Sequence, residues 1–371
     1  MARNKAVEYS TIHPGVILGQ ELEKRGIRQK EFASTIGMPT PVLNSLINGK
    51  RSITPDIAIL LEAALGKEAS FWLSLQSERD IEVAKMKESF IQKQKDIETW
   101  KDIQNYCNTR ILDKFISGGL GTSTSQKIET VLRFFGVQNI EQLRRCFVSN
   151  LDPAYFRKSA KRANDPISLF TWEYMAFASS ESYQQNIGLF NNATIDNLTK
   201  ELVPIFYENK GTEKRLINLL AKFGIKLIML SNENGTHIDG FSFWKGCNPT
   251  ITLTQRGKKL DILAFTLLHE IYHVYYHLDK NNQELTCISI DGEKTSRQEQ
   301  DADSFANNTL ISPIDWQIFK AKNQGISHYA MGPQIREFAE FHKIHPSIVL
   351  GRYQHDYKVY DNGRGIERSI N

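Results

Sequence analysis

Residues 29–47 of the chain read QKEFASTIGMPTPVLNSLI. Apolar side chains recur along this stretch at a spacing that lets them face one core: Phe32, Ile36, Met38, Leu43 and Leu46. The small Ala33 allows two helices to cross closely, and Gly37 supplies a turn that needs positive φ. The stretch therefore predicts a helix over 29–36 and a second one ending at Ile47, joined as a helix-turn-helix.

Further short helices are predicted on both sides of this pair. One covers about 14–25, another runs from Pro55 to Gly66 with Thr54 as its N-cap, and a fifth begins near Glu68 and runs through Lys95. A plain bundle of five helices has the same spacing, so spacing alone leaves both interpretations open.

In a helix-turn-helix, the N-terminal residues of the second helix read base edges in the major groove. The corresponding residues are Thr40, Pro41, Asn44 and Ser45. Other polar residues flank them at positions suited to phosphate contacts: Arg28, Gln29, Asn48, Lys50 and Arg51. A proline donates no backbone hydrogen bond, so Pro41 leaves the base specificity open.

Two blocks, HPGVILGQELEKRGIRQKEFASTIGMPTPVLNSLINGKRSIT (13–54) and LGKEASFWLSLQ (65–76), closely resemble the HigA-like antitoxin branch of the XRE/Cro-type helix-turn-helix family. The resemblance covers about residues 13–85. It implies a DNA-binding repressor fold, a double-stranded DNA operator as partner and a homodimer.

The length and composition indicate a multidomain globular protein. The 371 residues suffice for two or three domains, and 40% apolar with 24% charged residues excludes a mainly disordered or collagen-like chain. The N-terminal MARNKAVEYS lacks an apolar signal region, and the longest apolar run, 262–268, is far shorter than the roughly 18–20 residues of a membrane span. We expect a cytoplasmic protein without membrane contact. No CxxC pair and no internal repeat is apparent.

Three domains are predicted: a helix-turn-helix domain over 1–95, a helical connecting region over 96–200, and a third domain over 201–371. In the connecting region, Gly118-Gly119-Leu120-Gly121 lacks the lysine of a phosphate-binding loop. It is interpreted as a loop before a helix starting near Ser125.

The periodicity changes after residue 200. A helix over 214–223 is followed by alternating, β-like runs at 225–230, 240–244 and 250–253, and then by helices over 261–277 and 299–310. This is an α+β pattern with a small sheet. The strand at 240–244 is a candidate to pair with an extended peptide.

The helix over 261–277 contains the pentad His269-Glu270-Ile271-Tyr272-His273. Its histidines are at i and i+4, so they share one helix face and can bind one Zn²⁺ at about 2.0–2.1 Å. Glu270 is rotated by about 100°, where it can take a proton from water as a general base. His277, about 12 Å along the axis from His269, is too far to share that ion.

The third metal ligand is predicted in the next helix. Glu299 and Asp303 lie on one face, with Glu299 as the ligand and Asp303 as the acceptor that orients a zinc histidine. Asp301 lies about 160° from Glu299 and is the reserve ligand. The alternative is an ordinary acidic first turn that favours the helix dipole.

The blocks DGFSFW (239–244), NPTITLTQRGKKLDILAFTLLHEIYHVYYH (248–277) and EQDADSFANNTLISP (299–313) are similar to the ImmA/IrrE metallopeptidase family, over about residues 215–357. IHPSIVLGRYQHD (344–356) resembles a tail found in its helix-turn-helix fusions. The resemblance implies a zincin-like, gluzincin-type endopeptidase with one Zn²⁺ per chain, whose relatives cleave XRE-type repressors or antitoxins. Relatives often carry Glu where this chain has Asp301.

Together these patterns predict a DNA-binding transcriptional regulator fused to a zinc endopeptidase that cleaves a protein substrate: a repressor, an antitoxin or the chain itself within 85–101. The alternative is an antitoxin-like autorepressor whose metal domain senses or binds a partner without proteolysis. His345, Tyr353 and His355 are candidates for stabilising an oxyanion, although structural roles are favoured for each. The formal charge of +4 lies in residues 1–51, with eight Lys/Arg against four Asp/Glu, while the rest carries 38 of each sign.

Overall fold

The computed structural model describes residues 12–150, 165–230, 238–254, 259–281, 286–290, 297–360 and 365–371. The chain forms two compact units, Met1–Lys101 and Asp102–Asn371. The domain borders predicted at residues 95 and 200 fall inside helices α6 (Glu88–Ile103) and α12 (Ile195–Glu208). None of the described helices is both long and apolar enough to cross a lipid bilayer.

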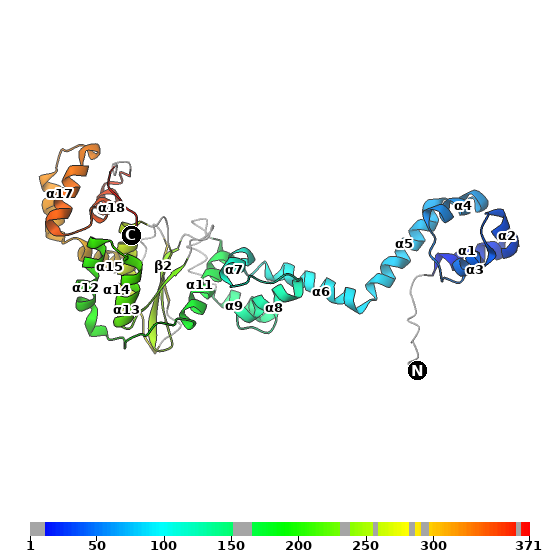
Figure 1. Cartoon of the computed structure of the whole chain (residues 1–371), viewed down its shortest axis with the longest axis horizontal. Helices are drawn as coiled ribbons and strands as arrows, with labels where there is room; N and C mark the ends of the chain where they lie inside the picture. Colours follow the sequence, from blue (N-terminus) through cyan, green and yellow to red (C-terminus); the bar gives the residue numbers. More distant parts are fainter. Residues whose placement is uncertain are drawn as a thin grey trace. The chain divides into compact units, whose positions relative to one another are not determined.

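The N-terminal unit contains the predicted run of short helices (Figure 1): α1 (Pro14–Lys24), α2 (Gln29–Thr35), α3 (Thr40–Ile47), α4 (Pro55–Leu65) and α5 (Ala69–Lys85). Gly37 turns the chain between α2 and α3 with φ of +66°. The helix-turn-helix residues Phe32, Leu43 and Leu46 are buried in one core with Trp72 of α5. The predicted supersecondary unit is therefore confirmed, along with its apolar face.

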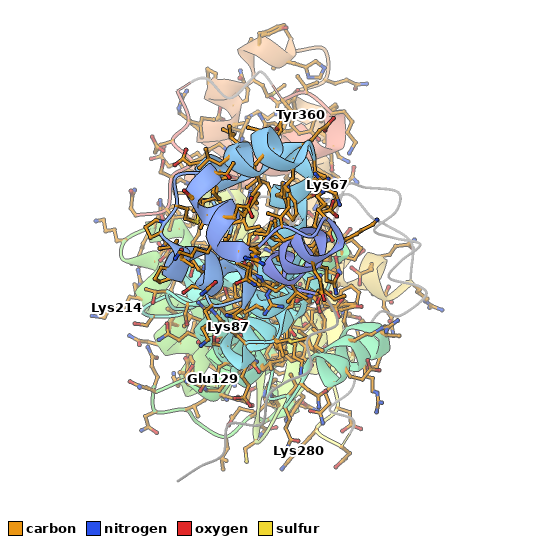
Figure 2. All side chains as sticks on the ribbon, turned by 90° about the vertical axis from the view of Figure 1, so that its right-hand side faces the viewer. Lys67, Lys87, Glu129, Lys214, Lys280 and Tyr360 are labelled. Atoms are coloured by element: carbon orange, nitrogen blue, oxygen red, sulfur yellow. The ribbon has the colours of Figure 1, made fainter. Side chains whose placement is uncertain are left out.

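The first and third helices of this unit touch backbone to backbone. A Cβ added at Gly15 of α1 would stand 1.7 Å from the carbonyl oxygen of Leu46 in α3. Only glycine fits there, because a backbone atom cannot turn aside. Lys67, labelled in Figure 2, links two helices of the unit through its side chain. Its Nζ lies 3.1 Å from Oε2 of Glu21 in α1 and above the ring of Phe71 in α5.

The fifth helix does not continue to Lys95 as predicted. It ends at Lys85, and α6 begins at Glu88 after a break that contains the exposed Lys87 (Figure 2). Neither glycine nor proline marks the break. The buried residues of α5 are Trp72 and Gln76, so its last two turns depend on helix propensity without core packing, and propensity alone is weak.

The C-terminal unit begins with helices that lead to the sheet: α7 (Thr109–Phe115), α8 (Thr124–Phe134), α9 (Ile140–Asn150) and α11 (Pro166–Glu181). The glycine-rich loop before α8 is a capping loop, as predicted. Asp113 accepts a hydrogen bond from the backbone of Leu120, and Ser123 and Gln126 form a reciprocal capping box.

The sheet has four strands in the order β1-β3-β2-β4, namely β1 (Lys226–Leu230), β2 (Ile238–Lys245), β3 (Asn248–Thr254) and β4 (Thr286–Ile290). The first three were predicted from their periodicity, whereas no strand was predicted between the helices over 261–277 and 299–310, where β4 lies. Strand β2 pairs with β3 on one side and with β4 on the other. The proposal that 240–244 pairs with a peptide is therefore wrong, because its backbone groups are already used within the sheet.

Helices cover both faces of this sheet (Figure 1). On one face Ile228, Phe241 and Phe243 pack with Trp172 of α11. On the other face Leu227 and Ile251 join the larger core built from α12, α13 (Thr212–Lys222) and α14 (Leu260–Tyr276). Because α14 lies inside this core, most of its side chains are buried, including polar ones.

Four helices complete the C-terminal unit: α15 (Arg297–Leu310), α16 (Pro313–Lys322), α17 (Gly332–His342) and α18 (Pro346–Tyr357). Helix α18 packs closely on α14, since a Cβ at Gly351 would stand 2.7 Å from Oδ2 of Asp261. Arg368 also pairs with Asp261, and its carbonyl accepts a hydrogen bond from Leu260 N. The first turn of α14 is thus held from two sides.

The corner between α17 and α18 has the same backbone geometry as the corner between α2 and α3, a geometry that also occurs between α1 and α2, where Ile27 N donates to the carbonyl of Leu22. Met38 N donates to the carbonyl of Ala33 at 2.8 Å, and Ile344 N donates to that of Ala339 at 2.9 Å. Lys343, with φ of +55°, stands where Gly37 stands in the first corner. The first helix of each of these two corners contains the sequence EFA, at 31–33 and at 337–339. This similarity was not predicted.

Candidate metal centre and nucleic-acid interface

Helix α14 carries both histidines of the pentad into the core of the C-terminal unit. His269 and His273 are 5% and 1% exposed, because α14 is packed between the sheet and its neighbouring helices. Their Nε2 atoms lie 3.0 Å apart. The i, i+4 spacing thus brings two imidazole nitrogens to one point, as predicted.

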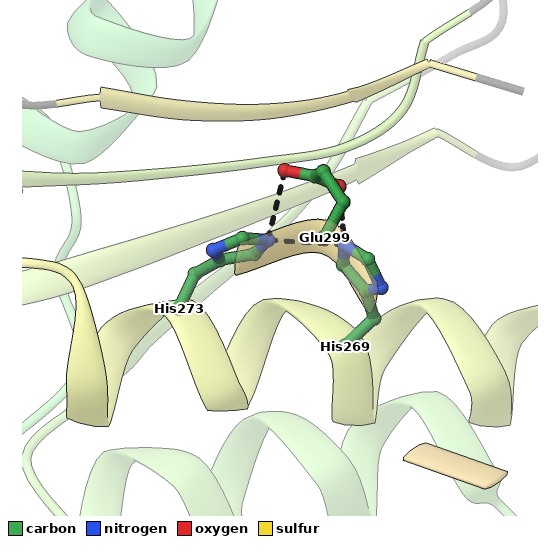
Figure 3. A group of neighbouring side chains, drawn as sticks. All are labelled: His269, His273 and Glu299. Atoms are coloured by element: carbon green, nitrogen blue, oxygen red, sulfur yellow. Dashed lines mark hydrogen bonds and ion pairs between the residues drawn. The ribbon is translucent and has the colours of Figure 1, made fainter. Parts of the chain in front are cut away.

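Glu299 of α15 meets these nitrogens from the opposite side (Figure 3). Its Oε2 lies 3.1 Å from Nε2 of His269 and its Oε1 lies 3.4 Å from Nε2 of His273. Ligands of a tetrahedral Zn²⁺ stand about 3.3 Å apart, given metal–ligand distances of about 2.0–2.1 Å. The three side chains offer ligand atoms within 4.8 Å of one another, so their spacing and chemistry fit a zinc ion with one coordination position to spare.

The far nitrogens of both rings have partners of their own. Nδ1 of His269 lies 3.0 Å from Asp303, as predicted, and Nδ1 of His273 lies 2.7 Å from Nδ1 of His277. These contacts aim both Nε2 atoms at Glu299. Asp301 is exposed on the outer face of α15 and is not in the cluster. The contact between His277 and His273 was not predicted from the sequence.

Charge shapes the protonation of this cluster. Burial lowers the pKa of His269, but hydrogen bonds with Asp303 and Glu299 outweigh burial and raise it to about 10. Burial raises the pKa of Glu299, whereas its hydrogen bonds with both histidines lower it well below the usual range. Burial lowers the pKa of His277, and the nearby His273 lowers it further. A proton and a metal ion therefore compete for Nε2 of His269.

The side chain of Glu270 points toward strand β2. Its side chain is fully buried, and its Oε2 accepts a 2.6 Å hydrogen bond from Ser242. Its other oxygen, Oε1, has no hydrogen-bond partner among the described residues. A carboxylate oxygen buried without a partner is energetically costly unless another group supplies a hydrogen bond.

The three oxyanion candidates make contacts elsewhere. His345 is the N-cap of α18, Tyr353 is hydrogen-bonded to Nδ1 of His328 at 2.5 Å, and His355 is exposed beside Asp356. None of them belongs to the cluster of described metal-ligand atoms. Their contacts support the structural roles favoured from the sequence.

The candidate base-reading residues lie in the first two turns of α3. Thr40, Asn44 and Ser45 are half-buried and Pro41 is exposed. Pro41 falls in the first turn, where a missing N–H costs no helical bond. The hydroxyl of Ser45 donates to the carbonyl of Pro41 at 2.9 Å, and Oδ1 of Asn44 is buried without a partner in the described chain.

The flanking residues assigned to phosphate are all exposed: Arg28, Gln29, Asn48, Lys50 and Arg51. Arg28 is the N-cap of α2 and Asn48 is the C-cap of α3. The helix-turn-helix therefore presents polar side chains at both edges of its second helix.

Comparisons with known proteins concern the N-terminal part of the chain. The helix-turn-helix family matches residues 18–72. Virulence-associated protein A of Dichelobacter nodosus is 42% identical over 18% of this chain and 66% of its own length. Antitoxin HigA-1 of Vibrio cholerae is 40% identical over 16% of this chain and 56% of its own length. The chain thus spans about two thirds or less of these relatives.

Among solved structures, an addiction module antidote protein of the HigA family from Coxiella burnetii is 38% identical. The match covers 21% of this chain and 86% of that one, with a TM-score of 0.20. Through its N-terminal segment, the chain belongs to the helix-turn-helix family.

Proposed function

We propose that the chain is a HigA-like, DNA-binding transcriptional regulator whose C-terminal unit is a zinc metalloendopeptidase. One observation carries the enzymatic part: His269, His273 and Glu299 offer three ligand atoms within 4.8 Å of one another. Glu270 follows His269 directly, as the general base of an HExxH peptidase does.

The DNA-binding part rests on family membership, on the exposed edge of α3 and on charge. The whole formal excess of +4 lies within residues 1–51, the segment that would meet the negatively charged DNA backbone. A homodimer on a palindromic operator matches the two-fold symmetry common to such repressors. A promoter gel shift tests this part, and unchanged binding by both Asn44→Ala and Lys50→Ala would refute the placement of the interface.

In the peptidase, each side chain has a separate task. Bound zinc would supply a Lewis acid that polarises the scissile carbonyl and acidifies the attacking water. Asp303 holds Nδ1–H of His269 and so keeps Nε2 free for the ion. Glu270 accepts the proton of the attacking water and passes it to the leaving amine.

The substrate class follows from the fusion. The proposed substrate is a repressor or antitoxin, or the chain itself. Within the chain, residues 85–101 are mostly exposed and lie at the border of the two compact units. A cut there would release the DNA-binding unit from the rest.

The test combines metal content with cleavage. Purified wild type is expected to hold one Zn²⁺ per chain and to cut a tagged, full-length Glu270→Gln chain in trans, or itself in cis. Glu270→Gln, whose amide is isosteric but cannot accept the proton, should keep zinc and cut nothing. Equal cleavage by both proteins would overturn the catalytic assignment.

A second candidate is an antitoxin-like autorepressor whose metal site senses or binds a partner without proteolysis. It is favoured by the family match of residues 18–72. Under this function, Glu270→Gln regulates its promoter as the wild type does, whereas His269→Ala does not. A regulatory defect in Glu270→Gln would favour the peptidase.

A further inference from the structure

Strand β2 holds the carboxylate of Glu270 through a hydroxyl. Ser242 and Glu270 are both fully buried, and Oγ of Ser242 donates to Oε2 of Glu270 at 2.6 Å. A hydrogen bond to a charged oxygen in a dry environment is short and strong. It fixes one of the two carboxylate oxygens and, with it, the rotation of the side chain.

A glycine on the same strand makes room for this carboxylate. A Cβ at Gly240 would stand 2.4 Å from Oε1 of Glu270 and 2.7 Å from its Cγ. The two residues are two apart on β2 and therefore share a face of the sheet, which is the face toward α14. Glycine is needed here for close approach to a side chain, since no positive φ is involved.

The two oxygens of Glu270 are therefore unequal. Oε2 is tied to Ser242, whereas Oε1 has no partner within the described part of the chain. We propose that Ser242 and Gly240 are positioning residues that leave Oε1 of Glu270 as the atom that accepts the proton. This inference rests on the proposed peptidase function.

The oxygen of water bonds to the scissile carbonyl carbon, and the proton of that water moves to Oε1. The C–N bond then breaks, and the leaving nitrogen takes the proton from Oε1. Oε2 keeps its hydrogen bond from the Ser242 hydroxyl throughout, and Oε1 carries the proton.

The competing explanation is that Ser242 merely ties the sheet to α14. Two variants separate these roles, since threonine and valine have the same shape and differ only in the hydroxyl. We expect Ser242→Thr to keep most of the activity on the chain cut in the proposed-function test. Ser242→Val should lose about tenfold or more in kcat with KM unchanged, and Gly240→Ala, which displaces the carboxylate, about a hundredfold.

A readout other than activity comes from thermal unfolding and zinc binding. Ser242→Val should lower Tm by about 4 °C in the wild-type background and far less in a Glu270→Ala background, because the carboxylate that needs the hydroxyl is then gone. Competition of each variant with a chelating dye for Zn²⁺ should give wild-type affinity. Thr252→Val is the matched control, because Thr252 is a fully buried hydroxyl of β3 without a hydrogen-bond partner among the described residues.

The outcomes distinguish this inference from the proposed function. Equal activity of Ser242→Thr and Ser242→Val, or the same loss of Tm in both backgrounds, overturns the positioning role while zinc binding and cleavage by the wild type still stand. A wild type that neither binds Zn²⁺ nor cleaves overturns the peptidase itself, whatever the unfolding data show.

Discussion

Nε2 of His269 is the atom where protonation and metal binding oppose each other. With a pKa of about 10, raised from 6.5, the metal-free side chain carries a proton at neutral pH. Zinc must displace this proton, so we expect release of about one proton per ion and an affinity that rises with pH. Calorimetry in two buffers with different ionisation enthalpies measures the release.

The same proton stabilises the metal-free fold. The pKa of His269 in the folded state lies above its ordinary value of 6.5. Its protonation therefore contributes fully to the free energy of unfolding below pH 6.5, and this contribution is lost as the pH rises through about 10. Zinc affinity that stays constant between these two values would contradict the raised pKa.

His277 contacts a proposed metal ligand and lies outside the proposed ligand set. Its Nδ1 lies 2.7 Å from Nδ1 of His273, so a neutral His277 can accept the proton of that nitrogen and leave Nε2 for zinc. Partners of this kind are worth about 10–100-fold in metal affinity, and we expect His277→Ala to lose that much in a chelator competition. Tyr276→Ala, which changes the exposed preceding residue, serves as control and should bind as the wild type does.

Helical periodicity in the sequence predicted four residues of the candidate metal centre. The pair His269 and His273 and the pair Glu299 and Asp303 are each one turn apart, which spacing alone reveals. Gly240 and Ser242 could not be found in this way, because their contact with Glu270 depends on how a strand lies across a helix. That arrangement arises from tertiary packing, which no local pattern encodes.

The α2–α3 and α17–α18 corners share one backbone geometry, and their second helices face different surroundings. Thr40 and Asn44 of α3 are half-buried and flanked by exposed basic residues. Val349 and Leu350 of α18 are fully buried, and Gly351 lies against Asp261 of α14. A reading helix must be free to enter a groove, so of these two helices α3 is the one that could do so.

This difference predicts where substitutions alter DNA binding. Lys50→Ala should weaken operator binding about equally for all sequences and reduce the slope of log affinity against log salt by about one, as the loss of a single phosphate contact does. Lys343→Ala, in the α17–α18 corner, should change neither. Titrations by fluorescence anisotropy at several salt concentrations measure both variants, and an equal effect of the two would contradict the assignment of α3.

Among the elements, the predictions held where a pattern was long or well punctuated. The helices α1 to α4, α8 and α13 and the strands β1 to β3 were predicted from turn residues and periodicity, whereas α7, α9 and α11 were predicted only as part of a helical region. Strand β4 has five residues, and its order in the sheet is set by pairing with β2, which is distant in sequence. The end of α5 was not predicted, because it results from a lack of packing partners. No glycine, proline or other residue type in the sequence indicates such a lack.

Both the net charge and the hydrophobic cores separate the N-terminal unit from the C-terminal unit. The buried core of the helix-turn-helix unit contains only residues from 18 to 72, and the cores around the sheet begin at residue 111. The net positive charge lies in residues 1–51, while the remainder is balanced. Each unit therefore has its own hydrophobic core, and the segment that would meet DNA contains none of the proposed metal ligands.

Removal of zinc tests, in the full-length chain, whether the two units are stabilised independently of each other. A ligand stabilises only the unit that binds it, by an amount set by its concentration over Kd. We expect a chelator such as EDTA to lower the melting transition of the C-terminal unit by several degrees, to leave that of the N-terminal unit unchanged, and to leave operator affinity within about twofold. Differential scanning calorimetry and anisotropy on the full-length protein measure these effects, with His269→Ala as the metal-free control that EDTA should not alter. If EDTA weakened operator binding of the wild type but not of His269→Ala, the metal site would be coupled to DNA binding, and the independence inferred from the separate cores would be wrong.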